Sequence, residues 1–313
     1  MGKQAGLIRR RLTPWLFLAP SLVGTVVFYG LPFLDVGKRS FQDAMGTRFA
    51  GLHNYRAVVD NEAFRLAAAN TVRFLAICMP LLMLVSFVTA SLLAAGAELK
   101  RKRADRSRGD RDTGIYGLFR TTLVLPMAVP AASMVLVWKI FLCPDGVLNQ
   151  WLCGITGETW QVDWAFSRWA FPILVMTYLW RHVGYDMVLW LAGLQSIHGE
   201  LYEAARMDGA GVLARLWYIT LPELRGTFVI VAVLSVVNAF RVYREAYLLA
   251  GSYPDASIYL LPHLFAHWFL NLDIGKMTAA AVLLTGTLGL LAVLGIGICR
   301  FRANMAGKGG RRP

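Results

Sequence analysis

The sequence predicts an all-α polytopic membrane protein with six transmembrane helices in a single domain, residues 1–313. Its composition is 57% hydrophobic and 16% charged, with a mean hydropathy of +0.50, which is too apolar for a soluble domain. Apolar runs long enough to cross a bilayer, for which about 20 residues are needed, recur along the chain. Lys and Arg gather between and beyond these runs, so the net charge of +13 indicates membrane topology and not nucleic-acid binding.

Each expected span has its own signal. The first follows a basic start that includes Lys3 and could mimic a signal peptide, but no small-residue cleavage site follows, so we expect a retained span. Pro80 should kink the second span, which neighbouring membrane helices can tolerate, and the third span contains Pro126 and Pro130. The expected spans cover about 12–34, 70–95, 121–142, 168–197, 227–249 and 277–299.

The distribution of basic residues predicts the orientation. Four lie before the first span, eight in 96–120, three in 198–226 and five after the last span, against six in the remaining loops. Because basic residues mark the cytoplasmic side, we expect both termini and segment 198–226 to be cytoplasmic in a multi-pass protein of the cell membrane.

The longest polar-tolerant segment between two apolar runs of the C-terminal half is Glu203–Pro222, EAARMDGAGVLARLWYITLP. It begins like a helix, breaks at Asp208-Gly209 and resumes toward Trp217. Since Asp favours turns and Gly tolerates unusual dihedrals, we expect two short helices joined by a bend. The consecutive alanines at 204 and 205 leave one helix face nearly bare, which suits close approach of another surface.

This segment resembles the EAA coupling loop of binding-protein-dependent ABC importer permeases, whose pattern is EAA, then Asp-Gly-Ala, then Ile-x-Leu-Pro. An ordinary amphipathic cytosolic hairpin is the alternative interpretation. Other stretches resemble the same family: TPWLFLAPSLVG, FAGLHNYRAVV, the Leu-Pro of the third span, and Gly146, Leu148 and Asn149 in the GxLN position. The matching residues of the loop are Glu203, Ala204, Ala205, Asp208, Gly209, Ala210, Ile219, Leu221 and Pro222.

The resemblance implies a type I ABC importer permease fold of the maltose and glycerol-phosphate type. It implies a second, related permease chain, two ATPase subunits that receive the coupling loops, and an external solute-binding protein that delivers a carbohydrate. ATP and Mg²⁺ would then belong to the ATPase, with no cofactor on this chain. His198, Gly226 and Ser252-Tyr253-Pro254 depart from the family pattern, and these departures bear on the substrate and not on the family.

Charged side chains inside spans are costly in hydrocarbon and usually face a cavity or partner. Arg181 and Asp186 lie in the fourth span, and Arg241 and Glu245 in the fifth, where an i,i+4 ion pair is one interpretation. Snorkelling to the external surface is a second. A carbohydrate pathway is the functional alternative, with the candidate residues Tyr178, Trp180, Arg181, Tyr185, Asp186, Asn238, Arg241, Tyr243, Arg244 and Glu245.

No catalytic or metal pattern is present in the sequence. There is no G-x-x-x-x-G-K-[ST] loop and no G-x-S-x-G serine, so ATP hydrolysis is expected on a partner chain and the chain is not expected to be an enzyme. His263 and His267 share a helix face but lack further ligands for zinc. Cys143 and Cys153 fall in one expected external loop, where a disulfide is a hypothesis. The rival classes are a self-contained secondary transporter or channel and, less well supported, a membrane-embedded enzyme.

Overall fold

The structure is a computed structural model that describes residues 15–43, 46–106 and 114–309. These residues are helical, with no β-strand among them and one isolated bridge between Gln42 and Phe49. The chain forms two compact units, one made of residues 1–65 and 264–313 and the other of residues 66–263. Each unit is described separately below.

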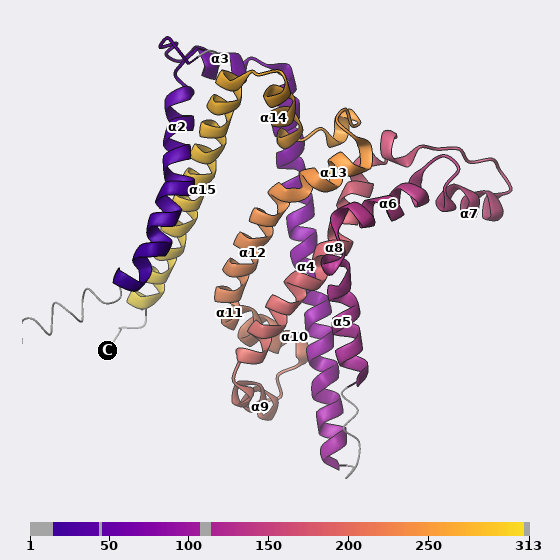
Figure 1. Cartoon of the computed structure of the whole chain (residues 1–313). Helices are drawn as coiled ribbons and strands as arrows, with labels where there is room; N and C mark the ends of the chain where they lie inside the picture. Colours follow the sequence, from indigo (N-terminus) through magenta and orange to yellow (C-terminus); the bar gives the residue numbers. More distant parts are fainter. Residues whose placement is uncertain (1–14, 44–45, 107–113, 310–313) are drawn as a thin grey trace, which may run out of the picture. The chain divides into compact units, whose positions relative to one another are not determined.

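In the first unit a helix runs from Trp15 to Arg39 and includes α2 (Leu31–Arg39). It packs against α15 (Ile274–Gly309), the long yellow helix of Figure 1. The short α3 (His53–Val59) also packs against α15. Two helices distant in sequence are therefore brought together by the segment that follows α2.

Asn54, from the FAGLHNY segment, holds that segment against the residues that follow α2. Its buried amide donates to the backbone carbonyls of Ser40 (3.0 Å) and Gln42 (2.7 Å). A Cβ atom added to Gly275, at the start of α15, would lie 2.9 Å from Asn54 Oδ1, so a glycine permits the close approach of α15. Gly51 has a φ of +57°, which favours glycine at this turn.

The second unit is a helical bundle built around α8 (Ala170–Ser196), which packs against α5 (Gly114–Ala128) and α12 (Arg225–Ala239). Most of α4 (Glu62–Arg106) belongs to this unit, and α4 continues through Pro80 without a break. The core beside α4 and α8 contains Phe74, Leu82, Leu174, Tyr178 and Ile258. Phe74 meets Tyr178 edge to face at 5.4 Å.

Asn70 and Thr71, the polar pair at the expected start of the second span, fasten α4 to a later loop of the same unit. The Asn70 amide donates to the carbonyls of Ala256 (2.6 Å) and Tyr259 (3.0 Å). Thr71 Oγ1 accepts a hydrogen bond of 3.0 Å from the backbone N–H of Leu261. These polar groups are thus satisfied by backbone partners near the helix end, as buried polar groups require.

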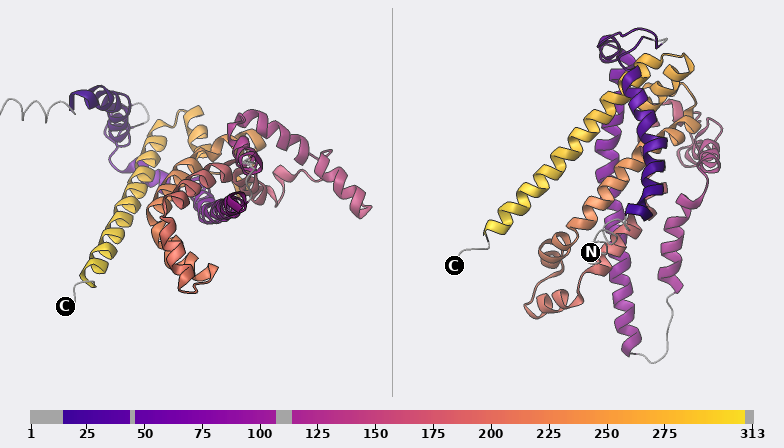
Figure 2. Two further views of the ribbon diagram at one scale, coloured as in Figure 1. Left: turned by 90° about the horizontal axis from the view of Figure 1, so that it is seen from below. Right: turned by 60° about the vertical axis from the view of Figure 1, so that its left-hand side comes forward.

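The third expected span, 121–142, is not one continuous helix. The chain forms two helices, α5 and α6 (Ala131–Leu142), with a break at Val129-Pro130. Pro130 lacks the N–H that would continue the helix. In Figure 1 and the left view of Figure 2, α6 and the following α7 (Val147–Thr156) lie across the direction of α4 and α5.

Within the described ranges, four helical stretches are long and apolar enough to cross a membrane: Trp15–Arg39, Glu62–Gly96, Ala131–Thr156 and Arg225–Ala250. Ile274–Leu290 is a shorter apolar helix. The 27-residue α8 is not among the four, because polar residues such as Arg181, His182 and Asp186 lower its mean hydropathy. The six-span boundaries therefore stay a prediction, whereas the all-helical, multi-pass character is confirmed.

Candidate functional site

The segment 199–223 folds as the expected helix–bend–helix. The first helix, α9 (Gly199–Met207), ends at Asp208, and Gly209 has a φ of +78°, a left-handed conformation that favours glycine. The backbone N–H of Ala210 then donates to Ala205 O (2.8 Å) and closes the helix end. The chain resumes as α10 (Val212–Arg215) and reaches α11 (Leu221–Glu223) through further helical turns.

A side-chain hydrogen bond of 2.9 Å between Tyr202 on α9 and Thr220 ties the two arms of this coupling loop together. Leu224, directly after α11, is buried in a core that contains Met187 and Trp190 of α8. Loop and bundle are therefore joined by packed side chains.

The matching residues of the motif separate into an exposed and an anchored part. Glu203, Ala204, Asp208 and Gly209 are exposed, whereas Ile219, Leu221 and Pro222 are partly buried against the bundle. Large apolar side chains that the sequence analysis did not single out are also exposed around the bend: Met207, Val212, Leu213, Trp217 and Tyr218. Met207 is 89% exposed, and such a cluster indicates a surface that another protein covers. The Ala-rich head would then make the contact, and the Ile-x-Leu-Pro tail would hold the loop in place.

Departures from the family pattern fit the backbone that they occupy. His198 has φ −63° and ψ 125°, a conformation that proline also adopts, so histidine leaves the entry to α9 unchanged. Gly226 lies in the first turn of α12, where a proline would also be tolerated.

Arg181 and Glu245 form an ion pair of 2.9 Å that joins α8 to α13 (Tyr243–Ala250). Their side chains are only 15% and 13% exposed. Glu245 is thus paired with a residue 64 positions earlier in the chain. The pairing of Glu245 with Arg241 along one helix stays a prediction, because the side chain of Arg241 lies outside the described residues.

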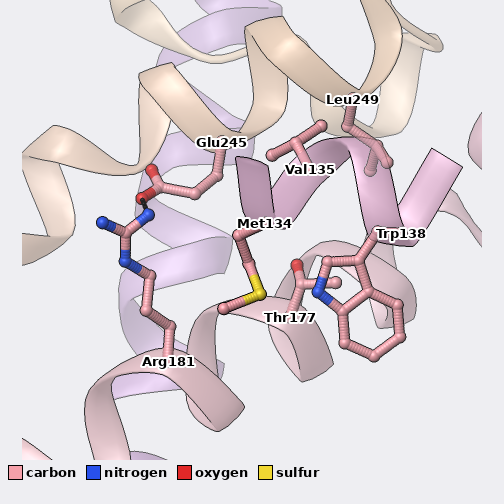
Figure 3. Close-up of a pocket in the computed structure, with 7 residues that line it drawn as sticks. All are labelled: Met134, Val135, Trp138, Thr177, Arg181, Glu245 and Leu249. Carbon is pink, nitrogen blue, oxygen red and sulfur yellow. Dashed lines mark hydrogen bonds and ion pairs between the residues drawn. The ribbon is translucent and has the colours of Figure 1, made fainter. Parts of the chain in front are cut away.

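The ion pair borders a small pocket of about 10 Å³, room for about one water molecule (Figure 3). Trp138 Nε1 and Glu245 Oε2 have no hydrogen-bond partner among the described residues. The pocket therefore offers a donor and an acceptor in an otherwise apolar wall, but it is too small for a sugar ring as it stands. Its lining residues are Met134, Val135, Trp138, Thr177, Arg181, Glu245 and Leu249.

Tyr178 and Asp186, two candidate pathway residues, are buried within the protein. Tyr178 packs between Phe74 and His182, and its neighbour Thr177 lines the pocket in its place. Asp186 is 1% exposed and accepts a 2.6 Å hydrogen bond from Ser235 of α12. Snorkelling of Asp186 to the surface, an interpretation left open by the sequence, is therefore wrong.

The other pathway candidates are dispersed. Trp180 is 45% exposed and meets Trp138 edge to face at 5.7 Å, beside the pocket. Tyr185, Asn238 and Tyr243 are half-buried, and Arg244 is exposed. The structure adds Met134 and Trp138 from α6, which the sequence analysis missed because nothing in the apolar run 131–142 indicates that it turns back toward α8.

Two glycines of α8 set its distance from its neighbours. A Cβ atom at Gly184 would overlap the carbonyl oxygen of Leu123 on α5 and lie 2.9 Å from the Cα atom of Val124. A Cβ atom at Gly193 would lie 2.7 Å from Cγ2 of Thr227 on α12. On a third side, Trp190 Nε1 donates to Ser86 Oγ of α4 (3.1 Å). Helix α8 is thus held between three partners with little free space.

Cys143 and Cys153 are both free, contrary to the disulfide hypothesis. Cys153 Sγ accepts a hydrogen bond of 3.1 Å from the backbone N–H of Trp160, and Cys143 caps the end of α6.

Among the described residues no group of three or more His, Cys, Asp or Glu could hold a metal ion. His263 is buried, and its Nδ1 accepts from the backbone N–H of Leu260 (3.2 Å).

A multi-pass helical membrane chain with an exposed helix–bend–helix between two bundle helices has the architecture expected of a transport subunit. The chain belongs to the family of binding-protein-dependent transport system inner membrane components, whose profile matches residues 104–302. Arabinooligosaccharides transport system permease protein AraP of Halalkalibacterium halodurans is 28% identical over 88% of this chain and 84% of that protein. Lactose transport system permease protein LacF of Rhizobium radiobacter is 28% identical over 74% of each chain.

The sn-glycerol-3-phosphate transport system permease protein UgpA of Agrobacterium fabrum is also 28% identical, over 90% of this chain and 92% of that protein. The fold matches a chain in the crystal structure of a bacterial ABC transporter involved in the import of the acidic polysaccharide alginate. The TM-score is 0.76 at 20% identity, with 96% of this chain and 99% of that chain covered. The type I ABC importer permease fold is thereby confirmed.

Breaking the Arg181–Glu245 pair should destabilise the protein. Glu245→Leu leaves the Arg181 cation without its counter-charge in a mostly apolar setting, and we expect a loss of about 2 kcal/mol. Thermal denaturation in detergent would measure it. The double variant Arg181→Met/Glu245→Leu should recover most of that loss, because no lone charge remains.

The matched control is the exposed pair of Arg65 and Asp60, whose side chains are 63% and 78% exposed. Asp60→Asn should leave the melting temperature nearly unchanged, since exposed pairs contribute little. If the double variant Arg181→Met/Glu245→Leu is as unstable as the Glu245→Leu single variant, the unpaired charge of Arg181 is not the cause of the lost stability.

Proposed function

We propose that this chain is the membrane-spanning subunit of an ATP-driven importer that takes up a carbohydrate. The observation that carries the proposal is the coupling loop, in which the motif residues form an exposed bend anchored between α8 and α12. The carbohydrate class is supported by the names of relatives that transport arabinooligosaccharides, lactose and glycerol 3-phosphate.

The partners in this proposal are a second, related permease chain, two ATPase subunits that bind ATP and Mg²⁺, and an external solute-binding protein. The chain lies in the inner membrane with both termini and the coupling loop on the cytoplasmic side, as the distribution of basic residues predicts. Its exposed apolar cluster, centred on Met207 and Tyr218, would fit a cleft on the ATPase surface.

The mechanism is that of a lever. Closure of the ATPase pair displaces α9, and the Tyr202–Thr220 hydrogen bond carries the displacement into both arms of the loop. Leu224 packs on α8, and Ser235 bonds Asp186, so α8 and α12 move as one body. Their movement would open the central pathway alternately to the two sides of the membrane.

The proposed carbohydrate pathway lies along α8, α12 and α13. Trp180 and Tyr185 would offer aromatic faces, and Asn238, Tyr243 and the Arg181–Glu245 pair would offer hydrogen-bonding groups. The pocket beside this pair is too small for a sugar ring, so the pathway must widen during transport. This agrees with a protein that changes between two states.

Purification of the tagged chain from its native host in mild detergent, followed by mass spectrometry, tests the proposal. We expect an ATPase with a phosphate-binding loop and a second permease-like chain to co-purify, and the associated binding protein can then be screened for sugars. A chain that purifies alone, and transports solute alone without ATP after reconstitution, would favour a secondary transporter.

Glu203→Ala should weaken docking of the ATPase. Glu203 is exposed on α9, next to the alanines that leave room for a partner surface. Loss of one interfacial carboxylate should lower the amount of co-purified ATPase several-fold while membrane insertion stays normal. The matched control is Glu200→Ala, one turn earlier on the same helix, which should retain the ATPase; equal loss in both variants would exclude a specific role for Glu203.

A further inference from the structure

Residues 131–169 of the second unit form a lateral arm, made of α6, α7 and the return segment to α8. At 1.5 Å per residue, the 12 residues of α6 and the 10 of α7 span only about 18 and 15 Å, too short to cross a bilayer core of about 30 Å. Figures 1 and 2 show both helices lying across the direction of α4 and α5. The stretch Ala131–Thr156 is therefore long enough to cross a membrane only as one continuous helix, and the turn between α6 and α7 divides it into two helices that are each too short.

The corner between α6 and α7 fixes how α7 is rotated. A Cβ atom at Gly146 would lie 2.6–2.7 Å from the carbonyl oxygens at the end of α6, so only glycine fits. Asn149, 1% exposed, bonds the carbonyls of Cys143, Pro144 and Val162 and accepts from Trp164 Nε1 (2.9 Å). With Asn149 held inward, the opposite face of α7 points away from the protein.

That outward face is an apolar stripe of Val147, Trp151 and Ile155, spaced four residues apart. These side chains are 44%, 62% and 64% exposed. Helix α7 contains no charged residue, and Asp145 and Glu158 lie just beyond its two ends. Asn149 and Gln150 lie on the other side of the helix, and an apolar face that includes tryptophan opposite a polar face is typical of an element lying in a membrane interface.

The surroundings of the stripe indicate lipid as the occupant. Four tryptophans of the chain's ten lie within 151–169, and tryptophan is enriched where the hydrocarbon core meets the head groups. Trp160 Nε1 and Trp164 Nε1 already donate to Thr156 and Asn149, so their rings are fixed beside α7. The arm continues directly into α8 at Ala170, near the start of the fourth expected span, so α7 lies close to the expected external end of that span.

We propose that α7 is an interfacial helix that lies in the bilayer surface, with Val147, Trp151 and Ile155 in contact with lipid acyl chains. In the orientation proposed above, this is the outer leaflet. Because α6 is joined to α7 by the rigid Gly146 corner, lipid contact along α7 also sets the position of Trp138 in the pocket. The inference does not depend on which solute is transported.

Spin labels test the contact in the purified importer complex, in nanodiscs of phosphatidylethanolamine and phosphatidylglycerol. A nitroxide would be attached at Ile155→Cys, with Glu158→Cys as the control beyond the helix end, after Cys143→Ser, Cys153→Ser, Cys78→Ala and Cys299→Ala. Oxygen concentrates in lipid, whereas a nickel chelate stays in water. We expect the accessibility of the nitroxide to oxygen, divided by its accessibility to the chelate, to be several-fold higher at position 155 than at position 158. A water-like ratio at 155 overturns the proposal, and so does a label closed to both reagents, which would indicate a protein cover.

A second measurement keeps the native cysteines. In vesicles of brominated phosphatidylcholine, Trp151→Phe should remove part of the quenched tryptophan emission of the complex. Trp217 lies in the exposed coupling loop, so Trp217→Phe should lower the total emission but leave the bromine-quenched part of it unchanged. If Trp151→Phe leaves the bromine-quenched part of the emission unchanged, the lipid contact is contradicted. This result does not depend on whether the cysteine-free variant used for spin labelling folds.

Discussion

Gly184→Ala is expected to prevent stable folding of the bundle, although it adds a single methyl group. The added Cβ atom would occupy the position of the Leu123 carbonyl oxygen, with the Cα atom of Val124 only 2.9 Å away. Both neighbours are backbone atoms, so no side-chain rotation relieves the overlap, and α5 and α8 must separate. We expect a loss of at least about 3 kcal/mol, the upper part of the range for overpacking, because the helices' whole contact is affected.

The measurement is the yield of monodisperse protein by fluorescence size exclusion, together with solute uptake by cells. Gly226→Ala is the matched control, because it makes the same change in a helix with no atom within 4 Å of the new Cβ. Alanine also favours helix over glycine by up to about 1 kcal/mol, so this control should fold at least as well as the parent. Normal yield and uptake with Gly184→Ala would mean that α5 and α8 are not packed as described.

The sequence predicts the fold class well because the signals for it are long and redundant. Apolar runs and basic clusters extend over dozens of residues, so the helical membrane character does not depend on any one of them. Breaks within a run are harder to predict. Pro80 and Pro130 are both prolines in apolar stretches, yet α4 continues through Pro80 whereas the chain turns at Pro130. Tertiary packing decides between these outcomes, and a local pattern does not contain it.

The coupling loop was predictable because its geometry is local. The bend at Asp208-Gly209 follows from turn propensity, and the structure has Gly209 in the left-handed region. Its division into an exposed head and a buried tail was not predictable from the motif alone. That division depends on Leu224 joining the buried core that contains Trp190, which lies 34 positions earlier in the sequence.

The arrangement of the candidate pathway residues, unlike the local geometry of the coupling loop, could not be predicted from the sequence. Charge inside a span indicated Arg181 and Glu245, and the structure does bring these two together. The partner of Glu245 could not be chosen from sequence, since Arg241 at i−4 satisfies the helical spacing equally well. Trp138 reaches the pocket only because α6 turns across the bundle, and no composition signal marks that turn.

Gly209→Val is expected to uncouple ATP hydrolysis from uptake while the protein still inserts and assembles. Gly209 has a φ of +78°, where a β-branched residue is strained by about 1–2 kcal/mol or more, although open space surrounds the position. The bend should therefore relax into another conformation, and α9 should lose its fixed direction relative to α10. We expect uptake to fall at least tenfold, about 1.4 kcal/mol in coupling, with ATPase activity retained in the purified complex.

Gly211→Val separates backbone strain from added bulk. Gly211 lies two residues further along the same exposed bend, has an extended backbone of φ −67° and ψ 170°, and also has no atom within 4 Å of an added Cβ. Valine adopts that conformation readily, so uptake should stay near the parent level if the lever depends on the shape of the bend. Equal loss in both variants would instead show that any bulk at the bend blocks the partner surface. Normal uptake with Gly209→Val would show that the loop does not act as a rigid lever, and force would then have to reach α8 and α12 by another contact.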